Sequence, residues 1–189
     1  LPVREPDRLV VAWKELRSAS PGHWPFLAAD IDVIGRESRT LESVAGVGYN
    51  GARPFIAIEH GSASYISGVS VSGNFFDVLG VEPILGRALT RADDVGGGEQ
   101  VLVITHGLWQ RRYAGSRDAI GRRVILGERP FTIVGVMPPD LEYPRGVEAW
   151  MPVAALTSIL TNEAFRVDVD ALARVRPGAT IGQARRGLQ

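Results

Sequence analysis

Histidines are the first residues of this chain whose type could serve chemistry, because zinc sites and general bases depend on them. His23, His60 and His106 do not follow the H-E-x-x-H or H-x-H spacing of a zinc site. Their places in a loop, a turn and the start of a helix suit polar residues without a catalytic duty. The chain has no cysteine, which excludes disulfides, thiolate ligands and cysteine nucleophiles.

Carboxylates form two short groups. Asp93 and Asp94 stand beside a run of glycines, a context that favours a solvated loop over a metal or acid–base pair. Asp168 and Asp170 alternate along an expected strand and so share one face. Without a third ligand nearby, they indicate the exposed side of an edge strand. The sequence predicts no metal site and no catalytic residues.

Glycines at 46, 48 and 51 match the G-x-G-x-x-G spacing of dinucleotide-binding loops. That motif works only when a helix follows, because the pyrophosphate binds at the helix N-terminus. Residues 52–56 have the character of a strand, so we interpret the glycines as a turn. A phosphate-binding P-loop is absent, since the only lysine, Lys14, is not preceded by glycine. No cofactor is predicted.

Composition limits the classes of partner. The 189 residues carry 21 basic and 21 acidic side chains, a formal net charge of zero. A neutral chain has no long-range field that gathers polyanions, so no nucleic-acid partner is predicted. No apolar run approaches the roughly 20 residues that span a bilayer. Both ends have the character of cuts in a longer protein.

Hydrophobic periodicity predicts an α+β fold. Short apolar runs bounded by turn residues indicate strands, and apolar residues three and four apart indicate helices. The order is mixed, with a strand-rich middle, and boundaries are expected after residue 79 and near residue 165. Strands are expected at 8–13, 55–58, 65–71, 101–104, 124–126, 131–136, 149–153 and 167–175, and helices at 26–39, 75–79, 105–113 and from 180 onward.

The segment 71–81 predicts a short buried helix in most detail. Ser72 or Asn74 can cap its start. Phe75, with the apolar residues three and four positions later, forms one apolar face. Gly80 can adopt the left-handed conformation that ends a helix.

Aromatic side chains are expected mainly in the core. Trp109 and Tyr113 lie four residues apart, and Phe75 and Phe76 lie on the short helix, so packing is favoured over a ligand cage. Trp24, beside a proline in a loop, is the aromatic residue that we expect to face a partner protein.

Collinear segments of the chain resemble one family. Together they are similar to the periplasmic core domain of MacB-like ABC transporter permeases, in particular the duplicated orphan permeases of the acidobacterial type. The segments are 1–13, 71–81, 85–87, 103–113, 120–122, 131–138 and 173–180. The positions to which the resemblance assigns a structural role are Ser72, Gly73, Asn74, Phe75, Phe76, Gly80, Gly86, Arg87, Trp109, Tyr113, Gly121, Arg122, Gly135 and Pro138.

The resemblance implies an architecture and a place in the cell. A porter-like α/β subdomain would comprise residues 1–79 and 166–189, and a β-rich, sabre-like subdomain would comprise residues 80–165. Such a domain is inserted between the first two transmembrane helices of a bacterial inner-membrane protein and faces the periplasm. Its implied partners are the parent transmembrane helices, a cytoplasmic ATPase, and an adaptor or cargo protein.

Three functional hypotheses follow from these patterns. The first is a non-catalytic module that transmits ATP-driven motion of the parent protein to periplasmic proteins. The second is a periplasmic module that binds a small ligand or lipid, which requires a deep apolar pocket. The third is an enzyme, which requires the histidines and carboxylates to converge in a cleft.

Overall fold

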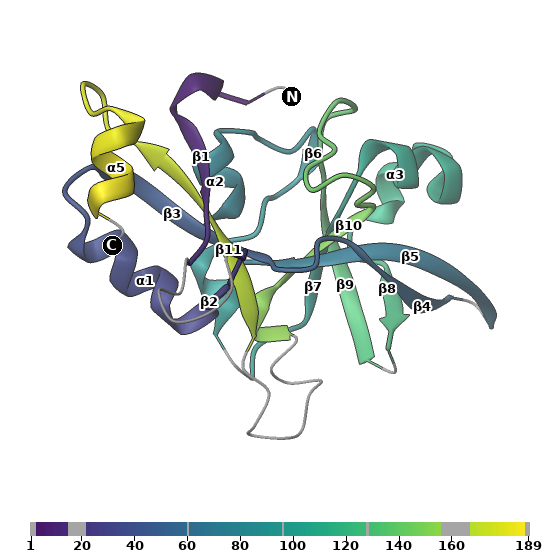
Figure 1. The fold of residues 1–189 in the computed structure, drawn as a ribbon. Helices are drawn as coiled ribbons and strands as arrows, with labels where there is room; N and C mark the ends of the chain where they lie inside the picture. The colour runs from purple at the N-terminus through teal and green to yellow at the C-terminus, as the bar shows by residue number, and fades with distance from the viewer. Residues whose placement is uncertain are drawn as a thin grey trace.

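The computed structural model describes residues 3–14, 22–59, 61–95, 97–127, 129–155 and 167–187. The chain forms two lobes with mixed helices and strands, and one long strand runs from one lobe into the other (Figure 1). The expected α+β class therefore agrees with the observed fold. His60 and most of the segment 154–165 lie outside the described residues.

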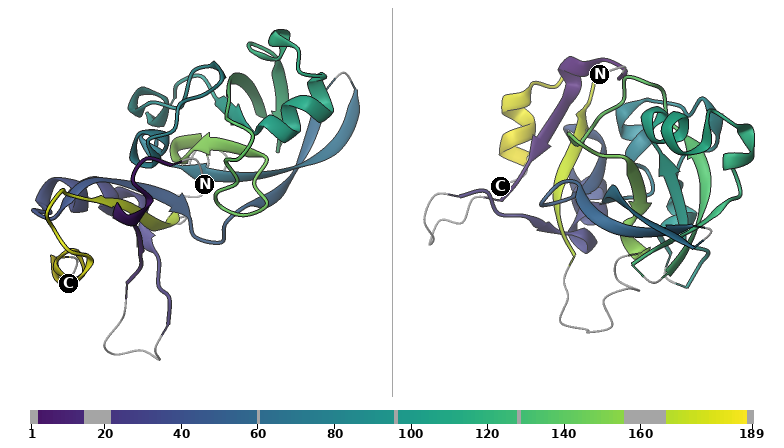
Figure 2. Two further views of the ribbon diagram at one scale, coloured as in Figure 1. Left: turned by 90° about the horizontal axis from the view of Figure 1, so that it is seen from above. Right: turned by 90° about the vertical axis from the view of Figure 1, so that its right-hand side faces the viewer.

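The first lobe is an antiparallel sheet with helices on one face. Its strands follow the order β1-β11-β3, and the two-residue strand β2 pairs with the start of β11. Helices α1 and α5 pack on one face through Ile31 and Ala184 (Figures 1 and 2). The elements are β1 (Leu9–Ala12), β2 (Phe26–Leu27), α1 (Ala28–Glu37), β3 (Leu41–Gly48), β11 (Asp168–Val175) and α5 (Ile181–Gly187), preceded by the 3-10 turn η1 (Pro6–Arg8).

The second lobe is a closed barrel of six strands. The order β5-β10-β7-β9-β8-β4 returns to its start because β4 also pairs with β5. The elements are β4 (Arg53–Glu59), β5 (Ser62–Val71), β7 (Val101–Ile104), β8 (Arg123–Leu126), β9 (Arg129–Val136) and β10 (Ala149–Pro152), with α3 (His106–Tyr113), the short strand β6 (Leu85–Gly86) and the 3-10 turns η2 (Arg91–Asp94) and η3 (Arg117–Ala119).

Strand patterning follows from what each barrel face contacts. In β7, Leu102 and Ile104 fill the barrel, whereas Val101 and Val103 face a core between the lobes. Both faces are buried, so the strand is apolar throughout. The outer face of β8 meets solvent, and its residues accordingly alternate between exposed and buried.

Strand pairing connects the sequence ranges that were expected to form separate subdomains. Strand β4 and the first part of β5 precede residue 79, yet they complete the barrel built from strands of residues 80–165. The end of β5 then joins the first lobe through the pair Val47–Val71. The strand pairing therefore does not follow the expected division at residue 79.

Two expectations about strands are wrong. Strand β11 lies between β1 and β3, so Asp168 and Asp170 are not on an edge strand. Gly46 and Gly48 lie within β3 and not in a turn. A Cβ atom at position 46 would lie 3.0 Å from Ser72 Oγ and 3.1 Å from Val169 Cγ2, so glycine allows a close approach there.

The short helix α2 (Phe75–Leu79) forms where it was expected, but neither predicted side chain caps it. Asn74 occupies the N-cap position and donates Nδ2 to Val44 O of β3 at 2.8 Å. Ser72 Oγ accepts a hydrogen bond from Gly46 N at 2.7 Å. Both side chains bind β3 because α2 packs directly on that strand. Gly80 ends the helix with φ 68°, as predicted.

Gly80→Val is expected to destabilise the domain by about 2 kcal/mol. A β-branched residue in the left-handed region is strained by roughly 1–2 kcal/mol, and the new Cβ would lie 2.6 Å from Arg4 Cβ. The melting temperature measures the loss. Gly178→Val is the matched control. Gly178 also has a positive φ, of 80°, but no atom lies within 4 Å of an added Cβ, so this variant has the backbone strain without the clash. An unchanged melting temperature for Gly80→Val would refute the cap.

Candidate functional site

Arg174 is a fully buried cation at the junction of α2, β11 and the N-terminal segment. Its side chain is 0% exposed. The guanidinium donates Nε to Val78 O at 3.0 Å, and Nη2 to Val78 O at 2.8 Å and Leu79 O at 3.2 Å. These carbonyls end helix α2, where the helix dipole favours a positive charge. Arg174 thus caps the C-terminal end of helix α2.

The N-terminal segment binds at the same junction. Arg4 N donates to Leu79 O at 3.1 Å, and Arg174 Nη1 reaches Glu5 O at 3.4 Å. Arg8 Nε donates to Val175 O at 2.8 Å. Residues 4–8 are therefore joined both to the end of α2 and to the end of β11. The chain approaches β1 along the tops of both elements (Figure 1).

Charged side chains surround the buried guanidinium. Arg8 forms ion pairs with Glu5, at 2.5 Å, and with Glu42 of β3, and Arg4 Nη2 lies 3.6 Å from Glu42 Oε1. The hydrogen bond from Arg8 lowers the pKa of Glu5 below its usual value. Burial, followed by repulsion from Arg4 and Arg8, lowers the pKa of Arg174. An arginine nevertheless stays protonated at neutral pH.

Sequence reasoning did not single out Arg174. The residue stands in the run Asp168–Val175, in which every neighbour from Val169 onward except Asp170 is apolar and buried. An arginine inside such a run is the available signal, because arginine is almost never fully buried unless its donors are satisfied.

Arg174→Met is expected to lower the free energy of unfolding by about 2–3 kcal/mol, because the carbonyl of Val78 would be left buried without a donor and that of Leu79 would keep only Arg4 N. Urea unfolding measures the change. Arg174→Lys keeps the charge but loses the planar fork, so it should fall between Met and wild type. Arg36→Met, at an exposed position of α1, should change stability by less than about 0.5 kcal/mol. A similarly small effect at position 174 would contradict the capping role.

Gly73 allows a second close contact between segments that are distant in the sequence. A Cβ at this position would lie 2.1 Å from Thr90 O, so the two backbones are in direct contact. Asp94 of η2 holds the contact by accepting hydrogen bonds from Gly73 N at 3.3 Å and from Ala154 N at 2.9 Å. The carboxylate of Asp94 thus links α2, η2 and the segment after β10.

Arg87 and Asp93 rigidify the loop that carries this contact. The guanidinium binds Asp93 with two hydrogen bonds of 2.7 and 2.8 Å, and Thr90 N donates to the same carboxylate at 2.7 Å. Burial raises the pKa of Asp93, but the hydrogen bonds from Arg87 and Thr90 outweigh it, and the pKa is lowered overall. The expectation that Asp93 and Asp94 form a solvated loop is therefore wrong, because both carboxylates bind protein groups.

Gly86 and Gly135 are opposite each other in the β6–β9 pair. An added Cβ would lie 2.1 Å from Val134 O at position 86 and 2.0 Å from Arg87 O at position 135. Both positions thus require glycine for close backbone approach. Pro138 follows the end of β9, and its carbonyl accepts from Leu141 N at 3.2 Å.

Tyr113 and Trp109 of α3 pack on the barrel, Tyr113 buried and Trp109 half-buried. Tyr113 Oη donates to Glu59 Oε2 at 3.1 Å, and Arg112 Nε donates to the same oxygen at 3.0 Å. Desolvation, together with the charge of Glu59, raises the pKa of Tyr113. These contacts fix α3 to the end of β4.

Arg122 and Gly121 lie in the turn between η3 and β8. The guanidinium of Arg122 lies 5.7 Å from the centre of the Tyr113 ring, in cation–π geometry, and 4.0 Å from Glu59 Oε1. Gly121 has φ 83°, and its N–H donates to Ile133 O at 2.8 Å. Both residues thus support the α3–barrel contact.

Trp24 is 41% exposed and lies near other exposed aromatic residues. Its backbone pairs with Lys14, and the neighbouring His23 ring contacts the rings of Trp13 and Tyr49. His23 Nε2 lies 2.6 Å from Asp170 Oδ1. This histidine–carboxylate pair is exposed, and no cluster of three potential metal ligands occurs within the described ranges.

Comparison with known proteins decides the family. The sequence profile of the MacB-like periplasmic core domain matches residues 3–189. The chain belongs to this family. The MacB-like domain is 28% identical over 145 residues to the macrolide export ATP-binding/permease protein MacB 2 of Aeromonas hydrophila, which covers 72% of the chain and 22% of that protein. A MacB of Hahella chejuensis is 31% identical over 94 residues, 48% of the chain and 14% of that protein.

Solved structures share the fold of the MacB-like domain. The periplasmic region of MacB from Actinobacillus actinomycetemcomitans has a TM-score of 0.71 and 18% identity over 95% of this chain and 79% of that one. A domain of a putative permease from Porphyromonas gingivalis has a TM-score of 0.67 and 20% identity, over 98% and 83% of the two chains. The extracellular domain of the transporter YknZ, from Gram-positive bacteria, has a TM-score of 0.65 and 16% identity, over 86% and 78%.

The chain is thus a MacB-like periplasmic core domain. It spans about a fifth of the length of the curated relatives that it matches. Within the ranges that the structure describes, every helix is too short or too polar to cross a membrane.

Proposed function

We propose that this domain is a non-catalytic module that passes ATP-driven motion of a parent transporter to adaptor or cargo proteins in the periplasm. The observation that carries the proposal is the junction at Arg174. Because residues 4–8 are bonded to α2 and β11, a pull on this segment displaces the core with it. In the family arrangement, that segment leads toward the first transmembrane helix, and the transmembrane helices lead toward the cytoplasmic ATPase.

As part of the same proposal, the first lobe corresponds to the porter-like part and the barrel corresponds to the sabre-like part. The core between the lobes is apolar and continuous, and α2 lies within it. Strand β5 also runs through both lobes. Motion that enters at the N-terminal segment would therefore reach the barrel, because a shared apolar core and a shared strand connect the described lobes.

The described pockets give little support to a small-ligand module. One pocket has a volume of about 120 Å³ and includes Asp32, Arg91 and Asp94 in its lining. Sites for drug-sized ligands are mostly apolar and have volumes of roughly 300–1,000 Å³. A pocket this small and polar does not suit a lipid or macrolide-sized molecule. A second pocket, of about 330 Å³, is open and is lined by polar side chains and Pro130, so it does not enclose an apolar ligand.

The test follows the domain in the parent transporter reconstituted in nanodiscs. Because the domain has no cysteine, Val33→Cys on α1 or Val95→Cys after η2 places a single dye in either lobe once any cysteines elsewhere in the parent transporter have been replaced. Energy transfer to labelled lipids then reports how the domain sits relative to the bilayer. We expect ATP, and trapping with vanadate, to change the transfer from both sites together.

Arg174→Met separates coupling from hydrolysis in the same preparation. It should reduce the ATP-dependent change in energy transfer while ATP hydrolysis continues, whereas Arg36→Met should alter neither. Continued hydrolysis with no change in energy transfer for the wild type would overturn the proposal. Turnover of a broad substrate panel by the isolated domain would overturn its non-catalytic part.

A further inference from the structure

Four large apolar side chains form an exposed group on the outer face of the barrel, which we name the β4–β8 face. They are Ile56 and Ile58 of β4, Tyr65 of β5 and Ile125 of β8. Their exposed fractions are 54%, 39%, 73% and 39%. Single exposed apolar residues are ordinary, whereas a contiguous group of them marks an interaction site.

Strand register makes this group contiguous. Ile56 is paired with Tyr65 across β4 and β5, and Ile58 is paired with Ile125 across β4 and β8. Directly paired residues on one face have Cβ atoms about 5 Å apart. Pro130 of β9, also exposed, continues the second row because it is paired with Ile125. The face therefore extends across β5, β4, β8 and β9.

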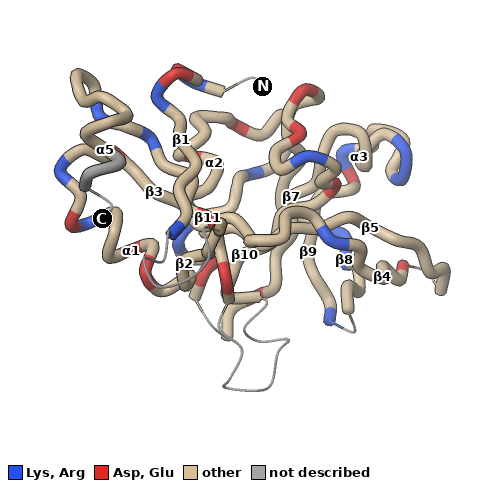
Figure 3. The backbone as a smooth tube through the Cα atoms, in the orientation of Figure 1, with Lys and Arg blue, Asp and Glu red and all other residues tan. Residues whose placement is uncertain are grey.

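An open pocket of about 330 Å³ adjoins the apolar rows. Arg123, Arg129, Pro130 and Thr132 line it, together with Glu99 and Gln100. Arg123 is one step beyond Ile125 on the same face of β8, and the ends of the β8–β9 hairpin are basic (Figure 3). Neither Arg123 nor Arg129 forms an ion pair with any of the described residues. Glu99 accepts a hydrogen bond from Thr132 Oγ1 at 2.7 Å.

We propose that the β4–β8 face and its arginine pocket dock a protein segment in which apolar residues alternate with carboxylates. The isoleucines and Tyr65 would cover the apolar side chains, and the two guanidinium groups would bind the carboxylates as bidentate forks. Apolar centre and charged margin are the usual anatomy of a protein interface. The inference rests on the proposed function, since it names the chemistry of the periplasmic partner.

Charge complementarity selects this partner over a second copy of the chain. In a two-fold contact the face would meet itself. Among the residues named on this face, Glu99 alone is a carboxylate, and a single carboxylate cannot neutralise both Arg123 and Arg129. A partner that brings carboxylates removes this mismatch, and a second copy does not.

The experiment uses the isolated ¹⁵N-labelled chain and a short synthetic peptide of alternating glutamate and valine. We expect amide shifts confined to β4, β8 and β9 and the first part of β5, which carries Tyr65. The double variant Arg123→Glu/Arg129→Glu should weaken binding by about tenfold or more, because each charge-assisted pair is lost and reversed. A peptide of alternating lysine and valine should not bind.

Matched controls distinguish binding at this site from general effects of net charge and of exposed apolar surface. Arg36→Glu/Arg39→Glu makes the same change of charge at exposed positions of the other lobe and should leave the affinity unchanged. Ile56→Lys should weaken binding, whereas Ile84→Lys should not, since Ile84 is similarly exposed, at 49%, but lies beside Val136 at the far end of β9. Each variant is first checked for an unchanged melting temperature.

Three results would overturn the docking proposal. They are amide shifts elsewhere or none, retained affinity in the Arg123→Glu/Arg129→Glu variant, and concentration-dependent dimers that Ile56→Lys dissolves. Binding to vesicles of phosphatidylglycerol in place of the acidic peptide would assign the face to a membrane and reject a protein partner. None of these outcomes changes the ATP-dependent energy transfer in the parent transporter, so the two proposals fail separately.

Discussion

Gly73→Ala is expected to destabilise the domain by about 3 kcal/mol or more, the upper end of what overpacking causes. The added Cβ would lie 2.1 Å from Thr90 O, 2.5 Å from Thr90 C and 2.9 Å from Arg91 Cα. All three are backbone atoms, so no side-chain rotation relieves the clash. Relief requires the η2 loop to move away, which breaks the hydrogen bond from Gly73 N to Asp94.

Urea unfolding of the isolated chain measures this loss, and Gly35→Ala is its control. Gly35 lies within α1, and an added Cβ would meet Val44 at an ordinary 3.9 Å. Alanine there should stabilise the domain by about 0.5–1 kcal/mol, because glycine weakens a helix interior. Opposite signs at the two glycines would support the contact between Gly73 and Thr90. Equal stability of Gly73→Ala and wild type would refute it.

Local signals in the sequence predicted local structure well. The helices expected at 105–113 and from 180 onward begin at these positions, where Thr105 accepts a hydrogen bond from Leu108 N at 3.2 Å and Thr180 accepts one from Gln183 N at 3.2 Å. Strand β8, expected at residues 124–126, forms at Arg123–Leu126. These features depend on residues within one helical turn or one strand, and that information is present in the sequence itself.

Features that depend on distant segments could not be predicted. Closure of the barrel needs β4 to pair with both β5 and β8, and the second pairing joins residues almost 70 positions apart. Ser72 and Asn74 carry an ordinary capping signal, yet β3 lies close enough to take both side chains. Arg174 acquires its partners from α2 and the N-terminal segment. In each case a tertiary contact replaces the local preference.

The junction at Arg174 and the proposed docking face use arginine for different purposes, the first for structure and the second for binding. Arg174 is buried and satisfied by carbonyls, so it fixes geometry. Arg123 is exposed and forms no ion pair with the described residues, so its charge is available to a partner. Since a buried cation stabilises a fold only when its donors are satisfied, the two arginines cannot exchange roles. This contrast explains why one variant should lower stability and the other should lower affinity.

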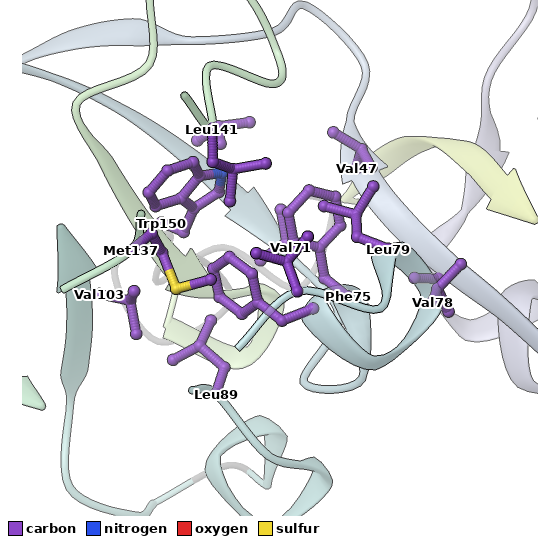
Figure 4. Packing of buried hydrophobic residues seen from close by; sticks show 14 of the residues in the cluster. Val47, Val71, Phe75, Val78, Leu79, Leu89, Val103, Met137, Leu141 and Trp150 are labelled. Atoms are coloured by element: carbon purple, nitrogen blue, oxygen red, sulfur yellow. The ribbon is translucent and has the colours of Figure 1, made fainter. Parts of the chain in front are cut away.

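Phe75→Ala is expected to lower the free energy of unfolding by about 3–5 kcal/mol, the usual range for a buried phenylalanine. Phe75 is fully buried, its ring lies 5.1 Å from that of Phe76, and it stacks on Tyr143 at 6.3 Å. Figure 4 shows it in the cluster that also contains Val71, Leu79 and Trp150. Because this cluster lies between the lobes, the cavity would weaken the contact that joins them.

Two measurements locate the effect of Phe75→Ala. Urea unfolding gives its size, with Tyr65→Ala, at a side chain 73% exposed, as a control that should change stability by less than about 0.5 kcal/mol. Hydrogen exchange should show faster opening in α2 and β10 than inside the barrel at β8. A loss below about 1 kcal/mol would mean that the ring is outside the core. Uniform acceleration of exchange would instead indicate that the lobes unfold as one unit, and the interlobe position of the cluster would then have no separate effect.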